Sequence, residues 1–123
     1  MTSRKKVTVL GATGSVGNST VDLLHRHPDK FETVALTGGN NVKNLIQKSL
    51  LLKPQLAVIK DPKLYDELKE GLEGTEIKAA AGEAAIIEAA EMEADTVVSS
   101  ILGAAGLLPT LAAIKQGKNI AVQ

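Results

Sequence analysis

The sequence predicts an α/β protein built around a doubly wound, mostly parallel β-sheet. Short apolar segments alternate with longer amphipathic segments along all 123 residues, which is the pattern of strands joined by helical crossovers. The apolar segments are nearly continuous rather than alternating with polar residues, as in strands that helices cover on both faces. Glycine or proline stands at most of the junctions, where these residues commonly end helices and form turns.

Six segments have the composition of short strands. Most of them are rich in Val, Ile, Leu and Ala and are bounded by residues that favour turns. We expect strands at residues 7–10, 31–37, 56–59, 75–80, 96–100 and 119–122. Because the sequence contains no internal repeat or linker, we expect one domain spanning residues 1–123.

The segments between the strands are predicted to be helices because apolar residues recur at intervals of three and four. The first helix ends before Pro28, and Asp61 with Pro62 opens the third. We expect the first two helices to bury Val16, Thr20, Leu23 and Leu24, then Val42, Leu45, Ile46, Ser49 and Leu50. Later helices are expected to bury Leu64, Leu68, Leu72, Ile86, Ile87 and Ala90, and a fifth Leu107, Leu108, Leu111, Ala112 and Ile114.

Composition argues against several classes of partner. Lys plus Arg and Asp plus Glu both number 14, so no field of one sign would draw the protein to nucleic acid or to a membrane surface. The sequence has no cysteine, which suits a cytoplasmic location. The basic first six residues lead directly into a strand, and no apolar run is long enough to span a bilayer. We therefore expect no signal peptide, no nucleic-acid partner and no membrane partner.

A glycine-rich turn joins the first predicted strand to the first helix. Gly11, Gly14 and Gly17 recur at intervals of three, and a strand–turn–helix unit of this kind binds phosphate through free N–H groups and the helix dipole. We expect Gly11 and Gly14 to adopt backbone conformations that other residues resist. Because Gly14 has no Cβ, it should also let a pyrophosphate approach the main chain, and Gly17 should let the helix pack closely on the strand. The hydroxyls of Thr13 and Ser15 can add donors, and Ser15 can also cap the helix. The alternative is a tight turn with no ligand.

The residues at the end of the second predicted strand indicate whether the dinucleotide is NAD or NADP. An NAD-binding domain usually carries Asp or Glu about 20 residues after the turn, to hold the ribose hydroxyls. Residues 37–41 contain no carboxylate, and their asparagines and backbone N–H groups favour the 2′-phosphate of NADP, with Lys43 near enough to supply charge. The alternative is that residues 38–41 form only a helix entry capped by Asn41, and both roles can coexist. Together, the turn and this loop predict an NAD(P)-binding, Rossmann-like domain.

No catalytic residue and no metal ligand can be assigned from the sequence. His25 and His27 stand near the end of the first predicted helix, where the dipole favours cations, and have no ligand spacing with a carboxylate cluster. Residues 99–104 end the fifth strand, so they either approach the nicotinamide end of a dinucleotide or form an ordinary loop.

Three stretches resemble one known family. They are Gly-Ala-Thr-Gly-Ser-Val-Gly at residues 11–17, Ala-Leu-Thr-Gly-Gly-Asn-Asn-Val at residues 35–42, and Ile-Leu-Gly-Ala-Ala-Gly-Leu-Leu-Pro-Thr-Leu-Ala-Ala-Ile at residues 101–114. They resemble the amino-terminal NADPH-binding domain of 1-deoxy-D-xylulose 5-phosphate reductoisomerases, and the third stretch is the most specific. The resemblance implies that the dinucleotide phosphates are held by Thr13, Gly14, Ser15 and Val16. It also implies that the adenosine ribose and its 2′-phosphate are surrounded by Gly39, Asn40 and Asn41. Gly38, from the same loop, belongs to this set of cofactor-binding residues.

The resemblance also implies an activity. Members of the family are NADPH-dependent oxidoreductases that convert 1-deoxy-D-xylulose 5-phosphate to 2-C-methyl-D-erythritol 4-phosphate, in the non-mevalonate route to isoprenoids. They are homodimers that need a divalent metal such as Mg²⁺ or Mn²⁺. The family pattern continues after the sixth strand with Ala-Asn-Lys-Glu, whereas this sequence ends Ile-Ala-Val-Gln. We therefore expect a fragment without the catalytic and carboxy-terminal domains or the metal ligands, which binds NADPH weakly or partly and is inactive alone.

Two other interpretations remain open at this point. One is the cofactor domain of another NADP-dependent dehydrogenase, such as a semialdehyde dehydrogenase, and residues 103–114 favour the reductoisomerase over it. The other is a non-catalytic module that binds a dinucleotide without chemistry.

Overall fold

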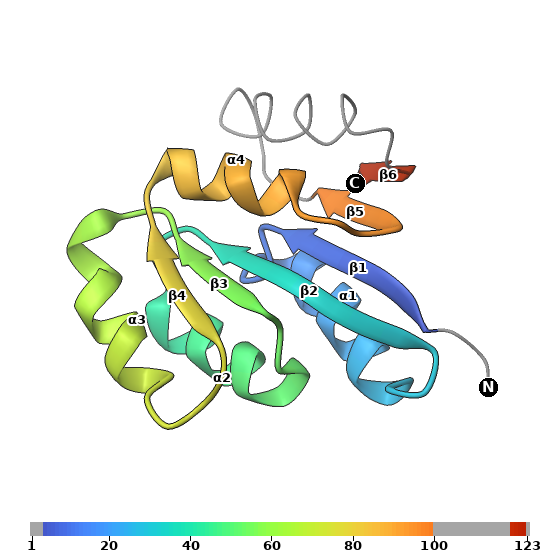
Figure 1. The fold of residues 1–123 in the computed structure, drawn as a ribbon, viewed down its shortest axis with the longest axis horizontal. Coiled ribbons are helices and arrows are strands. Elements are labelled where there is room, and N and C mark those ends of the chain that lie inside the picture. Colours follow the sequence, from blue (N-terminus) through green and yellow to red (C-terminus); the bar gives the residue numbers. More distant parts are fainter. Residues whose placement is uncertain (1–3, 100–118, 123) are drawn as a thin grey trace.

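The fold is a six-stranded parallel sheet with helices on both faces (Figure 1). The computed structural model describes residues 4–99 and 119–122. The strands are ordered β4-β3-β2-β1-β5-β6. Their bounds are β1 Lys5–Leu10, β2 Phe31–Gly38, β3 Leu56–Ile59, β4 Lys78–Ala81, β5 Thr96–Ser99 and β6 Asn119–Val122. The predicted doubly wound α/β fold is confirmed, and the predicted fifth helix lies outside the described residues.

Strand order reverses at β1, which pairs with β2 on one side and β5 on the other. The first four strands extend outward from β1 in sequence order, and the chain then returns to the opposite side of β1. In open parallel sheets, ligands bind outside the carboxyl ends of the strands near such a reversal. The carboxyl end of β1 leads into the glycine-rich turn, so the turn lies at this point of the sheet.

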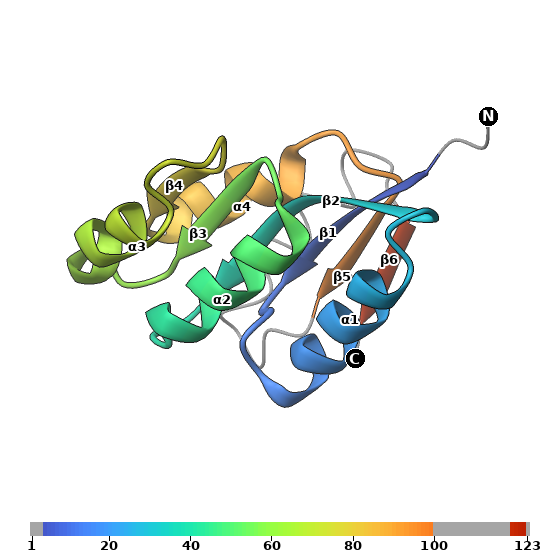
Figure 2. The ribbon, with the colours of Figure 1, turned by 90° about the horizontal axis from the view of Figure 1, so that it is seen from below.

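The helices are divided between the two faces. In Figure 2, α1 (Ser15–Arg26) and α2 (Val42–Leu52) lie in front of the sheet and α4 (Glu83–Glu91) lies behind it. The short α3 (Tyr65–Gly71), preceded by the 3₁₀ turn Pro62–Leu64, packs beside α2 and β4. Asp61 caps this 3₁₀ turn by accepting a hydrogen bond from Lys63 N, so the predicted cap is confirmed.

In the described part of the chain, two apolar clusters fill the space between sheet and helices. The larger cluster lies under α1, α2 and α3, and the smaller one lies under α4. The larger includes Val9, Val21, Leu24, Leu36, Leu45, Ile59, Leu68 and Leu72. The smaller consists of Val34, Ala35, Val58, Ile86 and Ala89. Because neighbouring residues of one strand belong to different clusters, both faces of the central strands are apolar, as the near-continuous apolar segments predicted.

The predicted buried faces of the first two helices are partly wrong. Leu23 and Leu50 were expected to face the sheet, but they are 44% and 45% exposed. On α1 the buried stripe runs through Val21 and Leu24, so Leu23 lies beside it rather than on it. On α2 the buried residues include Lys48 in place of Leu50, which a pattern based on apolar residues cannot predict.

The fourth strand begins later than predicted, at Lys78 rather than Thr75. The Thr75 hydroxyl donates a hydrogen bond to Leu72 O at 2.6 Å and accepts one from Ile77 N at 3.2 Å. A side-chain hydroxyl that bonds neighbouring backbone groups in this way stabilises a turn rather than a strand.

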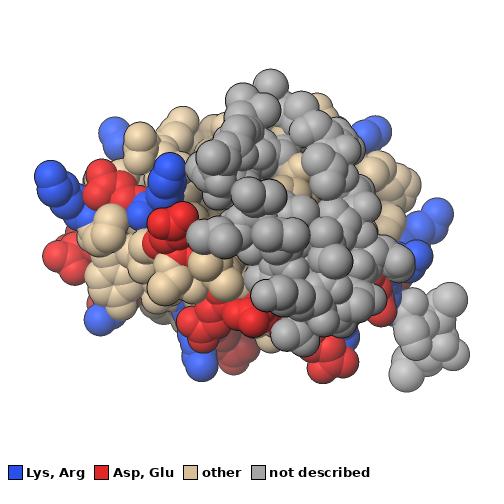
Figure 3. All heavy atoms as spheres, turned by 90° about the horizontal axis from the view of Figure 1, so that it is seen from above, with Lys and Arg blue, Asp and Glu red and all other residues tan. Residues whose placement is uncertain are grey.

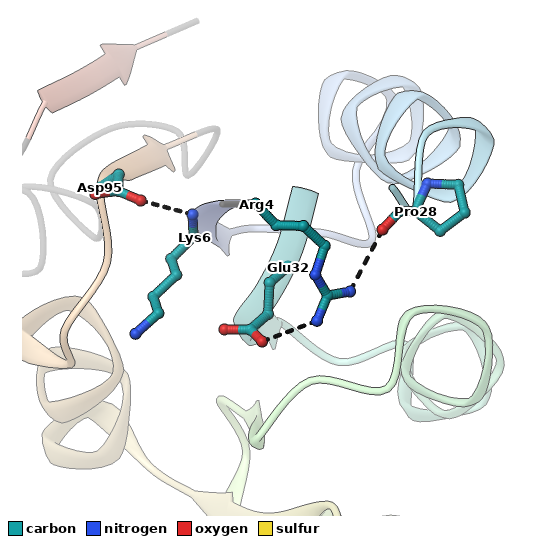
Figure 4. Close-up of polar contacts among 5 residues, drawn as sticks. All are labelled: Arg4, Lys6, Pro28, Glu32 and Asp95. Atoms are coloured by element: carbon teal, nitrogen blue, oxygen red, sulfur yellow. Dashed lines mark hydrogen bonds and ion pairs between the residues drawn. The ribbon is translucent and has the colours of Figure 1, made fainter. Parts of the chain in front are cut away.

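Polar contacts fix the amino end of the central strands (Figure 4). Arg4 pairs with Glu32 of β2 at 3.1 Å and donates to Pro28 O at 3.3 Å. Lys6 N donates to the Asp95 carboxylate at 2.7 Å, just before β5. The basic residues at the start of the chain therefore contact β2 and the approach to β5.

The surface carries charges of both signs. In Figure 3, acidic and basic side chains are interspersed around the part of this face that is described. Among the described residues, no helix is both long and apolar enough to cross a membrane.

Candidate functional site

The turn between β1 and α1 has the tight backbone that the glycine spacing predicted, with two corrections, at Gly14 and Ser15. Gly11 has a φ of 83°, a left-handed conformation that glycine adopts easily. Gly14 is the N-cap of α1, with φ −80° and ψ 174°, a conformation open to any residue. Ser15 is therefore the first residue of the helix, and the expectation that it could be the cap is wrong.

The other two glycines of the turn differ in the space around them. A Cβ atom on Gly17 would overlap the Gly11 carbonyl oxygen and lie 2.8 Å from Ala12 Cα. Gly17 thus allows the close packing of helix on turn that the sequence predicted. Apart from its two chain neighbours, a Cβ atom on Gly14 would have no atom of the described residues within 4 Å. Packing within the described part of the chain does not require glycine at position 14, so the open space there is available to a ligand.

Thr37, at the end of β2, joins the turn to the neighbouring loop. Its hydroxyl accepts a hydrogen bond from Gly11 N at 2.9 Å, and its carbonyl accepts one from Ala12 N at 2.7 Å. The side chain is 1% exposed. Sequence reasoning did not single out Thr37, although a hydroxyl residue at the end of the strand next to a glycine turn is a usable clue.

The loop at residues 38–41 lies directly beside the turn. A Cβ atom on Gly38 would lie 3.0 Å from Thr13 Cγ2, whereas one on Gly39 would have no atom within 4 Å from the described residues beyond its chain neighbours. Gly38 O accepts from Lys60 N at 2.9 Å, which ties the loop to the end of β3. Asn41 is the N-cap of α2, and its side chain accepts from Asn44 N at 3.2 Å. The capping role that the sequence suggested is confirmed.

The structure therefore brings the predicted residues together at one edge of the sheet. The two helices begin side by side there, after the neighbouring strands β1 and β2. The first hydrogen bond of α1 runs from Asn18 N to Gly14 O at 2.8 Å, and the N–H groups of the preceding helical residues have no acceptor within the helix. Such groups, with the dipole of each helix, attract anions. Asn40 and Asn41 are exposed, and the structure describes only the backbone of Ser15 and Val16.

Other candidate positions do not form a second site in the described part of the chain. His25 is exposed, His27 is the C-cap of α1, and Asp22 pairs with Arg26 at 3.2 Å. No cluster of three potential metal ligands occurs among the described residues. Of the predicted residues 99–104, only Ser99, which is buried at the end of β5, is described.

A cavity of about 750 Å³ lies at the opposite, amino-terminal edge of the sheet. It lies between the end of α2 and the starts of β3 and β4, and its lining includes Leu50, Leu56, Ile77 and Met92. It is larger than the other cavities described, but ligands of parallel sheets bind at the carboxyl edge. We therefore place the candidate site at the carboxyl edge, where the turn and the loop at residues 38–41 meet.

Comparison with known proteins decides the family. Residues 7–123 match the family described as 1-deoxy-D-xylulose 5-phosphate reductoisomerase. The chain belongs to the 1-deoxy-D-xylulose 5-phosphate reductoisomerase family. This membership argues against the semialdehyde dehydrogenase alternative.

Relatives named 1-deoxy-D-xylulose 5-phosphate reductoisomerase match almost the whole chain. The protein from Zymomonas mobilis is 49% identical over 99% of this chain, and that from Gluconobacter oxydans is 51% identical over 98%. The chain spans about 30% of the length of these relatives, 31% and 29% respectively.

Solved reductoisomerase structures have the same fold. The Zymomonas mobilis enzyme in complex with NADPH superposes with a TM-score of 0.96 over 98% of this chain and 32% of that chain. A reductoisomerase in complex with NADPH, fosmidomycin and magnesium gives a TM-score of 0.89, at 37% identity, over 94% of this chain and 29% of that one. The Rossmann-like fold that the sequence predicted is thus confirmed.

Proposed function

We propose that residues 1–123 are the NADPH-binding domain of a 1-deoxy-D-xylulose 5-phosphate reductoisomerase. One observation carries this proposal: Thr37 joins the glycine-rich turn to the carboxylate-free loop at residues 38–41. The two segments together provide backbone N–H groups at the starts of two helices, which is the chemistry that a phosphorylated dinucleotide needs. The Zymomonas mobilis relative, solved with NADPH, supports the choice of ligand.

We assign the pyrophosphate to the turn and the adenosine end to the loop. At the turn, Thr13 to Val16 would present N–H groups of the start of α1, and the open space at Gly14 would admit the phosphates. At the loop, the space at Gly39 would admit the ribose, with Asn40 and Asn41 beside it. The absence of Asp and Glu from residues 37–41 favours the 2′-phosphate, because a carboxylate there would repel it.

The reaction of the whole protein is part of the proposal. The complete enzyme would convert 1-deoxy-D-xylulose 5-phosphate to 2-C-methyl-D-erythritol 4-phosphate, with NADPH supplying a hydride. The residues of this chain would bind and orient NADPH. We assign sugar-phosphate binding and the divalent metal, Mg²⁺ or Mn²⁺, to parts of the enzyme outside this chain. We further propose a cytoplasmic homodimer that binds neither nucleic acid nor membranes.

Calorimetric titration of the chain with NADPH and NADH tests the proposal. We expect NADPH to bind more tightly than NADH, and we expect no oxidation of NADPH when 1-deoxy-D-xylulose 5-phosphate and Mg²⁺ are added to this chain alone. Failure to bind either nucleotide would contradict the cofactor-domain proposal. Equal affinity for the two would contradict the assignment of the 2′-phosphate to residues 38–41.

A further inference from the structure

Lys48 on α2 is buried, which is unusual for a lysine. The residue is 5% exposed and lies in the groove between α1 and α2, a cavity of about 380 Å³. Lysine is almost never buried unless its charge is paired, because removing an ammonium group from water is costly. Consistent with this cost, burial lowers the pKa of Lys48.

No carboxylate neutralises this ammonium among the described residues. Asp22 is the one acidic residue that lines the same groove, and it pairs with Arg26 at 3.2 Å instead. Lys48 Nζ donates a hydrogen bond to the Asn44 side-chain oxygen, one turn closer to the start of α2. The charge is thus directed toward the end of α2 that meets the proposed adenosine site, where it adds to the positive end of the helix dipole.

Two hydrogen bonds link Lys48 to the loop by way of Asn44. Lys48 Nζ donates to the Asn44 side-chain oxygen, and the backbone N–H of Asn44 donates to the Asn41 side-chain oxygen. An asparagine side chain has one acceptor oxygen and two N–H donors. With both oxygens engaged inside α2, the two amides have N–H groups to offer to a ligand. N–H donors at the edge of the site suit a phosphate, whereas the hydroxyls of an unmodified ribose usually donate to a carboxylate.

We propose that Lys48 is a positioning residue that sets the preference of this site for a 2′-phosphorylated adenosine, acting through Asn44 and Asn41. This inference rests on the proposed function, because it concerns the adenosine end of the same dinucleotide site. It adds a buried cation in the body of α2 to Lys43, the exposed cation in the first turn of that helix, since the loop at residues 38–41 itself contains no Lys or Arg.

The test compares Lys48→Met with the unsubstituted chain. Methionine has a similar length and no charge, so it should fill the space without the cost of burying an ammonium. We expect affinity for NADPH and for adenosine 2′,5′-bisphosphate to fall roughly tenfold, and affinity for NADH to change less than about twofold. Lys69→Met, which removes an exposed lysine from α3, is the matched control and should change neither affinity.

Asn44→Ala provides a second variant that keeps the charge of Lys48 and removes the side chain to which Lys48 donates, while the backbone N–H at position 44 still caps through Asn41. We expect it to lower the ratio of NADPH to NADH affinity in the same direction as Lys48→Met. Circular dichroism and thermal unfolding would establish that both variants are folded.

The outcomes separate this inference from the function on which it rests. If the unsubstituted chain binds neither nucleotide, the proposed function fails and the inference fails with it. If the chain prefers NADPH and Lys48→Met keeps the same preference, the inference alone is overturned. If Lys48→Met lost affinity for NADPH and NADH equally, the role of Lys48 would be structural only, and this result would also overturn the inference.

Discussion

At the scale of single residues, the three glycines of the turn have different tasks. Gly11 provides a left-handed backbone, Gly17 provides close packing, and Gly14 provides space that the protein leaves open. Sequence spacing alone predicted all three positions but attributed conformational freedom to Gly14 as well. The observed φ of −80° shows that the value of Gly14 lies in its missing side chain.

Gly14→Ala and Gly17→Ala should therefore change different properties: the first should lower NADPH affinity, and the second should lower the stability of the fold. Gly14→Ala adds a methyl group in open space, so the free energy of unfolding should change by less than about 1 kcal/mol, while NADPH affinity should fall at least about tenfold. Gly17→Ala places a methyl group against backbone atoms, so the free energy of unfolding should fall by about 2 kcal/mol or more. Chemical denaturation measures the free energy of unfolding, and titration calorimetry measures the affinity for NADPH. Normal NADPH binding by a folded Gly14→Ala variant would argue against phosphate contact at this turn.

Thr37 is the residue whose hydroxyl holds the turn to β2. Thr37→Val keeps the shape of the side chain but leaves Gly11 N without its buried acceptor. We expect this change to destabilise the protein by about 1–3 kcal/mol, and to weaken NADPH binding because the turn keeps only the backbone bond from Ala12 N to Thr37 O. Thr37→Ser keeps the hydroxyl and should retain more of both properties. An unchanged melting temperature for Thr37→Val would show that the hydrogen bond does not support the turn.

At the scale of helices and strands, sequence patterns predicted which elements exist and in what order better than they predicted which face of each helix is buried. Leu56–Ile59 has the predicted bounds, because it is a compact apolar strand between Gln55 and Lys60. The buried stripe of α2 was partly wrong, because a lysine that bonds Asn44 lies where an apolar residue was expected. Such a position depends on the packing of α1 against α2, which one segment of sequence does not contain.

The start of α2 combines a helix cap with the proposed phosphate site, and one substitution can separate the two. Asn41→Asp keeps a side-chain oxygen for Asn44 N, and Asp is as good an N-cap as Asn, so stability should stay within about 0.5 kcal/mol. The new carboxylate would repel a 2′-phosphate and could accept bonds from ribose hydroxyls. We expect NADPH affinity to fall roughly tenfold while NADH affinity holds or rises.

Asn41→Ala is the control for the cap itself. It should lose about 0.5–2 kcal/mol of stability without creating repulsion. Comparing the ratio of NADPH to NADH affinity in the two variants isolates the charge. If Asn41→Asp left that ratio unchanged, the 2′-phosphate would not lie at this loop.

At the scale of the whole molecule, the site exists because the sheet places two separate segments side by side. The sequence predicted the glycine turn and the loop at residues 38–41 as separate candidates, and the parallel pairing of β1 with β2 brings their ends together. The contact of Thr13 with Gly38 and the bonds made by Thr37 follow from that pairing. Those contacts could not be predicted from the sequence, because they depend on the register between strands.

A ligand that spans two such segments should stabilise the folded protein as a whole. A ligand that binds the native state alone, at 100 times its dissociation constant, adds about 2.7 kcal/mol. For a protein of this size, we expect the melting temperature to rise by about 8–14 °C with NADPH at that ratio. NADH at the same absolute concentration should give a smaller rise, because the loop lacks the carboxylate that would hold its ribose. Differential scanning calorimetry measures the shifts, and an equal or larger rise with NADH would contradict the assignment of NADPH to this site.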